Sequence, residues 1–130
     1  MIGVDTNVLV RLFTADDAEQ HGKALDFFRE RSANSPAFVS AVTIAETIRV
    51  LRLTYGFSHD EILGVLLTLL ETDDFVLDGG EALRAARDAD KSALLADFLV
   101  ALLGRQAGCS HSVTFDQKAA KAVPSMELLA

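Results

Sequence analysis

The sequence predicts an α/β fold in which helices cover both faces of a parallel sheet. Five short apolar segments indicate strands, at residues 1–5, 37–40, 74–78, 111–115 and 126–129. Between them, apolar residues recur at helical spacing in 17–31, 41–54, 59–71, 80–90, 93–107 and 116–122. Because strands that alternate with helices are joined by right-handed crossovers, we expect them to lie parallel in one sheet. Functional residues of such sheets gather at the carboxyl ends of the strands.

The length and composition predict one domain over residues 1–130. Half of the 130 residues are apolar, which is enough to bury a core without covalent staples. Cys109 is the only cysteine, so an intrachain disulfide is excluded and a reducing compartment is favoured. The N-terminus lacks a basic leader, and charges interrupt every apolar run before it reaches the roughly 18 residues of a membrane span. We therefore expect a soluble, cytoplasmic protein with no membrane partner.

The formal net charge of −7 argues against a protein that coats nucleic acid through a general positive field. It does not exclude a nuclease, because a site that collects carboxylates around a divalent metal ion contributes several of these charges itself. Gly79-Gly80 lacks both the glycine spacing and the Lys-Ser/Thr pair of a phosphate-binding P-loop. Nucleotide hydrolysis by that route is excluded.

Four carboxylates are placed to converge at the edge of the predicted sheet. Asp5 ends the first strand and Asp116 ends the fourth. Glu46 lies about two turns into the helix after the second strand, and Asp97 interrupts the apolar run ALLADFLVALL before the fourth strand. An ionised carboxylate in an apolar setting needs a partner. Since hard cations prefer oxygen ligands, the sequence predicts Mg²⁺ or Mn²⁺ as that partner.

Three of the four acids also fit a structural role. Asp5 and Asp116 fit N-caps of the helices that follow them. Glu46 fits a capping box with Thr43. For Glu46 and Asp116, taken singly, the cap is the stronger interpretation. For Asp97 the metal role is favoured, because its helical neighbours carry no positive charge.

Four segments, IGVDTNVLVRL, VSAVTIAE, LADFLVALL and VTFD, together resemble a PIN-domain ribonuclease, and more closely the toxins of VapBC toxin–antitoxin modules. They occur in that family's order, and the resemblance runs from residue 1 to residue 129. It implies a three-layer α/β/α sandwich with a five-stranded parallel sheet, and an endoribonuclease that uses Mg²⁺ or Mn²⁺. Matching positions assign catalytic and metal-binding roles to Asp5, Glu46, Asp97 and Asp116, and supporting roles to Asn7 and Thr114.

One position departs from the family pattern. Many relatives carry a further acid one turn before Asp97, where this chain has Leu94, which puts any mechanism with five carboxylates in doubt. The resemblance also implies an RNA substrate, a cognate antitoxin protein and a homodimer. The dimer face is expected on apolar residues of the helices from 41 to 71, namely Leu53, Tyr55, Phe57, Ile62 and Leu66. The alternative is that these residues belong to the core.

The predicted reaction is hydrolysis of RNA by metal-activated water, which leaves a 5′ phosphate and a 3′ hydroxyl. Arg11, Lys118 and Lys121 are the basic residues best placed for RNA phosphates, with ordinary solvated helix charge as the other interpretation. Two further classes compete. A metal-dependent phosphatase would need a second Asp where Asn7 stands, and a PIN-like domain that only binds RNA or protein would not need all four acids.

Overall fold

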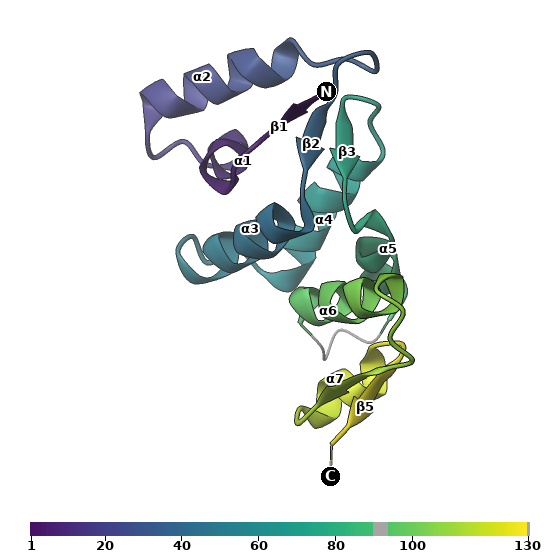
Figure 1. The fold of residues 1–130 in the computed structure, drawn as a ribbon. Coiled ribbons are helices and arrows are strands. Elements are labelled where there is room, and N and C mark those ends of the chain that lie inside the picture. The colour runs from purple at the N-terminus through teal and green to yellow at the C-terminus, as the bar shows by residue number, and fades with distance from the viewer. Residues whose placement is uncertain (90–93, 130) are drawn as a thin grey trace.

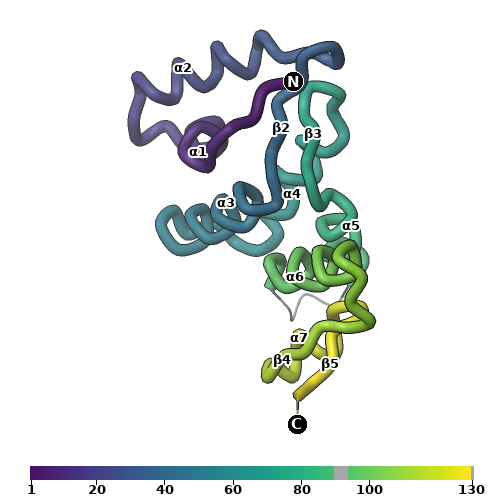
Figure 2. Tube along the Cα trace, viewed as in Figure 1, coloured from purple at the N-terminus to yellow at the C-terminus, as the bar shows by residue number. Residues whose placement is uncertain are grey.

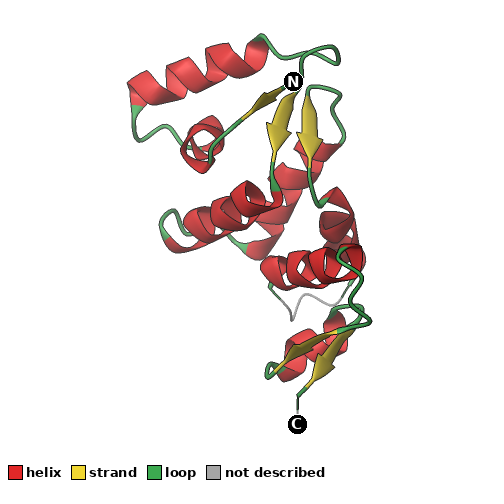
Figure 3. Cartoon of the chain, viewed as in Figure 1, coloured by secondary structure: helices red, strands yellow, loops and turns green. Residues whose placement is uncertain are grey.

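A computed structural model describes residues 1–89 and 94–129 of the chain. Along it the elements are β1 (Ile2–Gly3), α1 (Thr6–Phe13), α2 (Ala18–Arg29), β2 (Ala37–Val39), α3 (Ala41–Leu53), α4 (His59–Leu70), β3 (Phe75–Leu77), α5 (Gly80–Asp88), α6 (Leu95–Gln106), β4 (Ser112–Thr114), α7 (Gln117–Ala122) and β5 (Met126–Leu128) (Figure 1). Strands and helices alternate along most of the chain, as Figure 3 shows, which confirms the predicted α/β class. The ends of the helices predicted at 80–90 and 93–107 fall partly outside the described residues.

The strands form two parallel sheets, so the prediction of a single five-stranded sheet is wrong. β1, β2 and β3 form one sheet in that order, and β4 pairs with β5 in the other. Strands of two or three residues contribute few ladder hydrogen bonds, and helix packing decides where they lie. α6 packs against α5 and α3 and leads the chain away from β1, so β4 and β5 lie at the opposite end of the molecule (Figure 2).

We call residues 1–89 and 94–106 the body, and residues 112–128 the C-terminal unit. The body holds most of the apolar core, in which the largest fully buried side chains are Leu9, Val39, Ile44, Leu51, Ile62, Leu66 and Leu83. Ile62 and Leu66 are 1% and 0% exposed, so they belong to the core and not to a dimer face. Leu53, in contrast, is 62% exposed at the end of α3.

Most of the described helices begin at a side-chain cap, whereas α5 and α6 have none. Ser58 and Glu61 form a capping box at the start of α4. At α3 the cap is Ser40, whose hydroxyl accepts a hydrogen bond from the backbone N–H of Thr43 at 3.2 Å. In the described part of the chain, none of the helices has both the length and the hydropathy that a membrane span needs.

Candidate functional site

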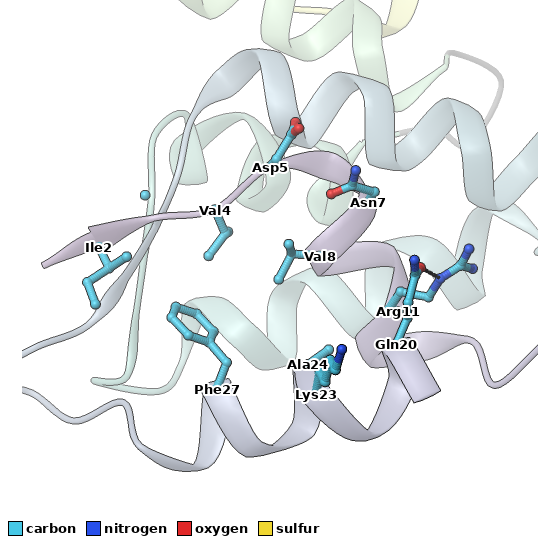
Figure 4. A pocket seen from close by; sticks show the side chains of 11 residues that line it. Ile2, Val4, Asp5, Asn7, Val8, Arg11, Gln20, Lys23, Ala24 and Phe27 are labelled. Carbon is cyan, nitrogen blue, oxygen red and sulfur yellow. Dashed lines mark hydrogen bonds between the residues drawn. The ribbon is translucent and has the colours of Figure 1, made fainter. Parts of the chain in front are cut away.

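Asp5 lies between β1 and α1, at the carboxyl end of its strand as predicted. Its Oδ1 accepts a hydrogen bond from the backbone N–H of Thr6 at 2.8 Å, so Asp5 does cap α1. The cap uses one carboxylate oxygen, and the side chain is exposed to solvent. Figure 4 shows Asn7 close by on the first turn of α1. Capping and ligand binding are therefore compatible at Asp5.

Glu46 meets this region from the second turn of α3. The buried Thr6 donates its hydroxyl hydrogen to Oε2 of Glu46 at 2.7 Å. Because Ser40 already caps α3, the alternative in which Glu46 closes a capping box with Thr43 is wrong. Asp5, Asn7 and Glu46 line one cavity of about 320 Å³ between α1 and α3. The structure thus brings two of the four predicted acids to one place.

Asp97 is the third residue of α6 and so lies in its first turn. A negative charge in the first turn complements the helix dipole, which partly accounts for its presence in an apolar run. Burial raises the pKa of the Asp97 carboxyl, the nearby charge of Asp116 raises this pKa further, and a backbone hydrogen bond at Leu94 acts in the opposite direction. No Lys or Arg among the described residues forms an ion pair with Asp97.

Asp116 follows β4 and caps α7. One oxygen of its carboxylate accepts hydrogen bonds from the backbone N–H groups of Lys118 and Ala119, at 2.9 and 3.1 Å. The hydroxyl oxygen of Thr114 accepts the backbone N–H of Asp116 at 3.0 Å, so Thr114 supports the loop that carries this acid. The cap interpretation of Asp116 is confirmed. As at Asp5, the side chain is exposed.

The four acids therefore form two pairs in two places. Asp5 and Glu46 line one cavity, whereas Asp97, at the start of α6, lies near enough to Asp116 of the C-terminal unit for the charge of Asp116 to raise the pKa of Asp97. Within residues 1–89 and 94–129, no three His, Cys, Asp or Glu side chains gather closely enough to hold a metal ion. The donor chemistry of both pairs nevertheless suits Mg²⁺ or Mn²⁺, because the donors are carboxylate oxygens and the charges of Asp97 and Asp116 repel each other.

The predicted RNA-binding cations differ in their surroundings. Arg11 is held by Asp16 at 3.0 Å, by Gln20 at 2.8 Å and by the Tyr55 hydroxyl at 2.9 Å. The hydrogen bond that Arg11 donates to the Tyr55 hydroxyl is the main reason that the pKa of Arg11 is raised. Arg11 thus links α1 to Asp16, to Gln20 of α2 and to Tyr55 after α3. Lys118 and Lys121 are exposed on α7.

Two further cations, Arg49 and Arg52 of α3, were missed in the sequence. With His59 they line a cavity of about 220 Å³ whose wall also includes Leu94, Leu95 and Ala96, next to Asp97. A signal was present, because Arg49 follows Glu46 by three residues and so lies on the same side of the helix.

Comparison with known proteins gives one family. The PIN domain model matches residues 2–123. The solved structure of VapC20 from Mycobacterium tuberculosis, described as a sarcin-ricin loop cleaving toxin, is similar at 20% identity and a TM-score of 0.47, over 93% of this chain and 94% of that one. Among curated proteins none matches the chain. Since the family model covers nearly the whole sequence, this chain belongs to the PIN domain family.

Proposed function

We propose that this chain is a metal-dependent endoribonuclease that hydrolyses RNA phosphodiester bonds with water. Membership of the PIN family supports the proposal. The observation that carries it is the shared cavity of Asp5 and Glu46, because two elements distant in sequence place carboxylates beside a solvent-accessible space. An acid pair of this kind suits a hard cation better than it suits fold stability.

Asp5, Glu46, Asp97 and Asp116 would hold Mg²⁺ or Mn²⁺, which when bound polarises a phosphate oxygen and lowers the pKa of a bound water. The chain's own residues orient the reactants. The hydrogen bond from Thr6 fixes Oε2 of Glu46, which leaves Oε1 to accept a proton from the attacking water. Thr114 supports the loop that carries Asp116, and Asn7 would support the loop that carries Asp5. The expected products are a 5′ phosphate and a 3′ hydroxyl.

RNA phosphates would lie along the cations nearest to the acids. Arg49 and Arg52 line the cavity beside Asp97, and Lys118 and Lys121 follow Asp116 on α7. Arg11 has the weaker claim, because Asp16 and Tyr55 already occupy its guanidinium. We assign Arg11 to positioning α1 and the other four to phosphate contacts.

The resemblance of the four sequence segments supports a biological role as the toxin of a type II toxin–antitoxin module. A cognate antitoxin would then bind near the acids and insert an Arg or Lys among them, since charge-assisted hydrogen bonds to carboxylates are strong. Expression of the chain alone is expected to arrest growth. Co-expression with the neighbouring reading frame is expected to restore it, and arrest that persists despite a stable complex would contradict this mode of inhibition.

A second candidate is a non-catalytic PIN domain that binds RNA or protein. The separation of the two acid pairs favours it, because neither pair alone makes a metal site of three carboxylates. This candidate predicts RNA binding without cleavage. Analysis of the RNA for cleavage products distinguishes this candidate from a nuclease.

The test is cleavage of a 5′-labelled RNA by the purified chain with Mn²⁺, with EDTA, and after substitution. Asp5→Asn and Glu46→Gln each remove a charge at nearly constant shape, and we expect at least about a 100-fold loss of rate. Asp73→Asn, at the exposed turn between α4 and β3, is the control and should cleave like the wild type. Cleavage that persists in EDTA or in Asp5→Asn would overturn the proposal.

A further inference from the structure

The sheet of the body is open along β1. β1 pairs with β2 on one side, and no described strand pairs with its other edge. Along this edge runs a cavity of about 550 Å³ whose apolar wall is formed by Ile2, Val4, Val8, Ala24 and Phe27. In Figure 4, the side chains of Val4 and Val8 point toward the ring of Phe27, whereas Asp5 points away from it. The open edge thus ends at a predicted catalytic acid.

The C-terminal unit is open along β4 in the same way. β4 pairs only with β5 among the described strands. Large apolar side chains around this pair are exposed, Val113 by 56%, Phe115 by 80% and Leu128 by 44%. Two short strands and a six-residue helix are marginal as an independent fold. Exposed apolar side chains on such a unit indicate a surface that is covered by another protein segment.

The two open edges of one chain lie at opposite ends of the molecule (Figures 1 and 2). α6 lies between them and packs on α3 and α5, so β4 reaches β1 of its own chain only if α6 leaves the body or the loop after it is rebuilt. A second copy has no such restriction. Because every chain carries one edge of each kind, two copies offer each other two equivalent contacts, the requirement for a closed symmetric dimer.

We propose that two copies of this chain form a dimer in which β4 of each copy pairs with β1 of the other. Each composite sheet then has five parallel strands, with the partner's C-terminal unit covering the apolar cavity beside β1. If the register places Asp5 opposite the partner's Asp116, Ile2 lies opposite the partner's Val113. The partner's Asp116 and Asp97 come beside Asp5 and Glu46, so each site takes two acids from each copy. Only this last step rests on the proposed function.

The mass in solution tests the dimer without any assay of activity. Light scattering should give about 28 kDa, twice the 14.0 kDa of the chain, with dissociation on dilution. Val113→Asp places a charge on the exchanged strand and should give a monomer. Leu53→Asp, on a similarly exposed residue of α3, is the matched control and should remain a dimer. A dimer that Leu53→Asp abolishes and Val113→Asp leaves intact would overturn the proposal in favour of a contact through the helices.

Cross-linking separates exchange from closure within one chain. Ile2→Cys and Val113→Cys are combined with Cys109→Ser, and a short thiol reagent is added to the folded protein. The proposal expects a covalent dimer on a denaturing gel. A cross-link that leaves the chain monomeric would show that β4 folds back onto its own β1, and it would overturn the proposal.

Complementation tests whether the acids are shared. Asp5→Asn and Asp116→Asn, inactive singly, are co-refolded. Half of the dimers then contain one of each chain, and one of their two sites has all four acids, so we expect about a quarter of the wild-type rate. If the wild type cleaves RNA but the mixed variants recover no activity, the sharing of the site between copies is overturned. An inactive wild type would overturn the proposed function and leave the mass and the cross-link to decide the exchange.

Discussion

The body and the C-terminal unit bury their apolar residues to very different extents. In the body, Leu9, Leu51 and Leu66 are fully buried. In the C-terminal unit the buried side chains are Ala119, Val123 and Met126, while Val113 beside them is more than half exposed. Of the predicted acids, Asp116 lies in the C-terminal unit and the other three lie in the body, with Asp97 of α6 near Asp116 at the boundary. The difference fits the proposed strand exchange, in which the core forms first, the sheet is completed by a second copy, and the proposed site depends on that second step.

Truncation in the two regions should give the largest contrast. Leu66→Ala leaves a cavity in the body, so we expect the free energy of unfolding to fall by about 2–5 kcal/mol. Phe115→Ala removes a ring that is already 80% exposed, and in dilute monomer the change should stay below about 0.5 kcal/mol. Urea titration at micromolar concentration measures both. Equal losses would mean that the Phe115 ring is buried in the monomer, which would contradict the open surface of the C-terminal unit.

A buried hydroxyl of the body gives the next largest effect. The Thr47 Oγ1 is buried without a hydrogen-bond partner among the described residues. Thr47→Val replaces it by a methyl group of similar shape, and we expect a gain of about 1 kcal/mol. Thr14→Val is the control, because the buried Thr14 hydroxyl donates to the Val10 carbonyl at 2.9 Å and its loss should destabilise. Thermal melts of the two variants should shift in opposite directions.

Asp97→Asn tests the boundary between the two regions. It should give the smallest change in the free energy of unfolding. Burial and Asp116 raise the pKa of Asp97 above its ordinary value of 3.8. Since the folded state then holds this proton more tightly than the unfolded chain does, ionisation of Asp97 reduces stability as the pH rises above that value. At pH 7 without metal we expect Asp97→Asn to be more stable than the wild type, by less than about 1 kcal/mol.

The gain should vanish below pH 3.8, where Asp97 is protonated in both states. Melting curves across this pH range, with Asp73→Asn as the control, measure it. A variant that melts below the wild type at pH 7 would mean that the Asp97 charge stabilises the fold.

The sequence was sufficient to predict the strands and helices, because apolar periodicity and caps are local. Asp5 and Asp116 lie at strand ends as expected, and both cap the next helix. The pairing of β4 was not predictable, because a strand of three residues, Ser112–Thr114, has no feature that selects its neighbour. Glu46 was also ambiguous, since Thr43 and Ser40 both fit a cap and only the fold shows that Thr6 binds its carboxylate.

Binding of Mn²⁺ tests most directly whether acids from the two regions form one site. Calorimetric titration without RNA should show that Asp5→Asn and Asp116→Asn each weaken Mn²⁺ affinity, by at least about 10-fold. Asp73→Asn should bind like the wild type. If Asp116→Asn binds Mn²⁺ as tightly as the wild type while Asp5→Asn does not, the acids of the C-terminal unit are not part of the site, and the account of a site divided between two regions is wrong.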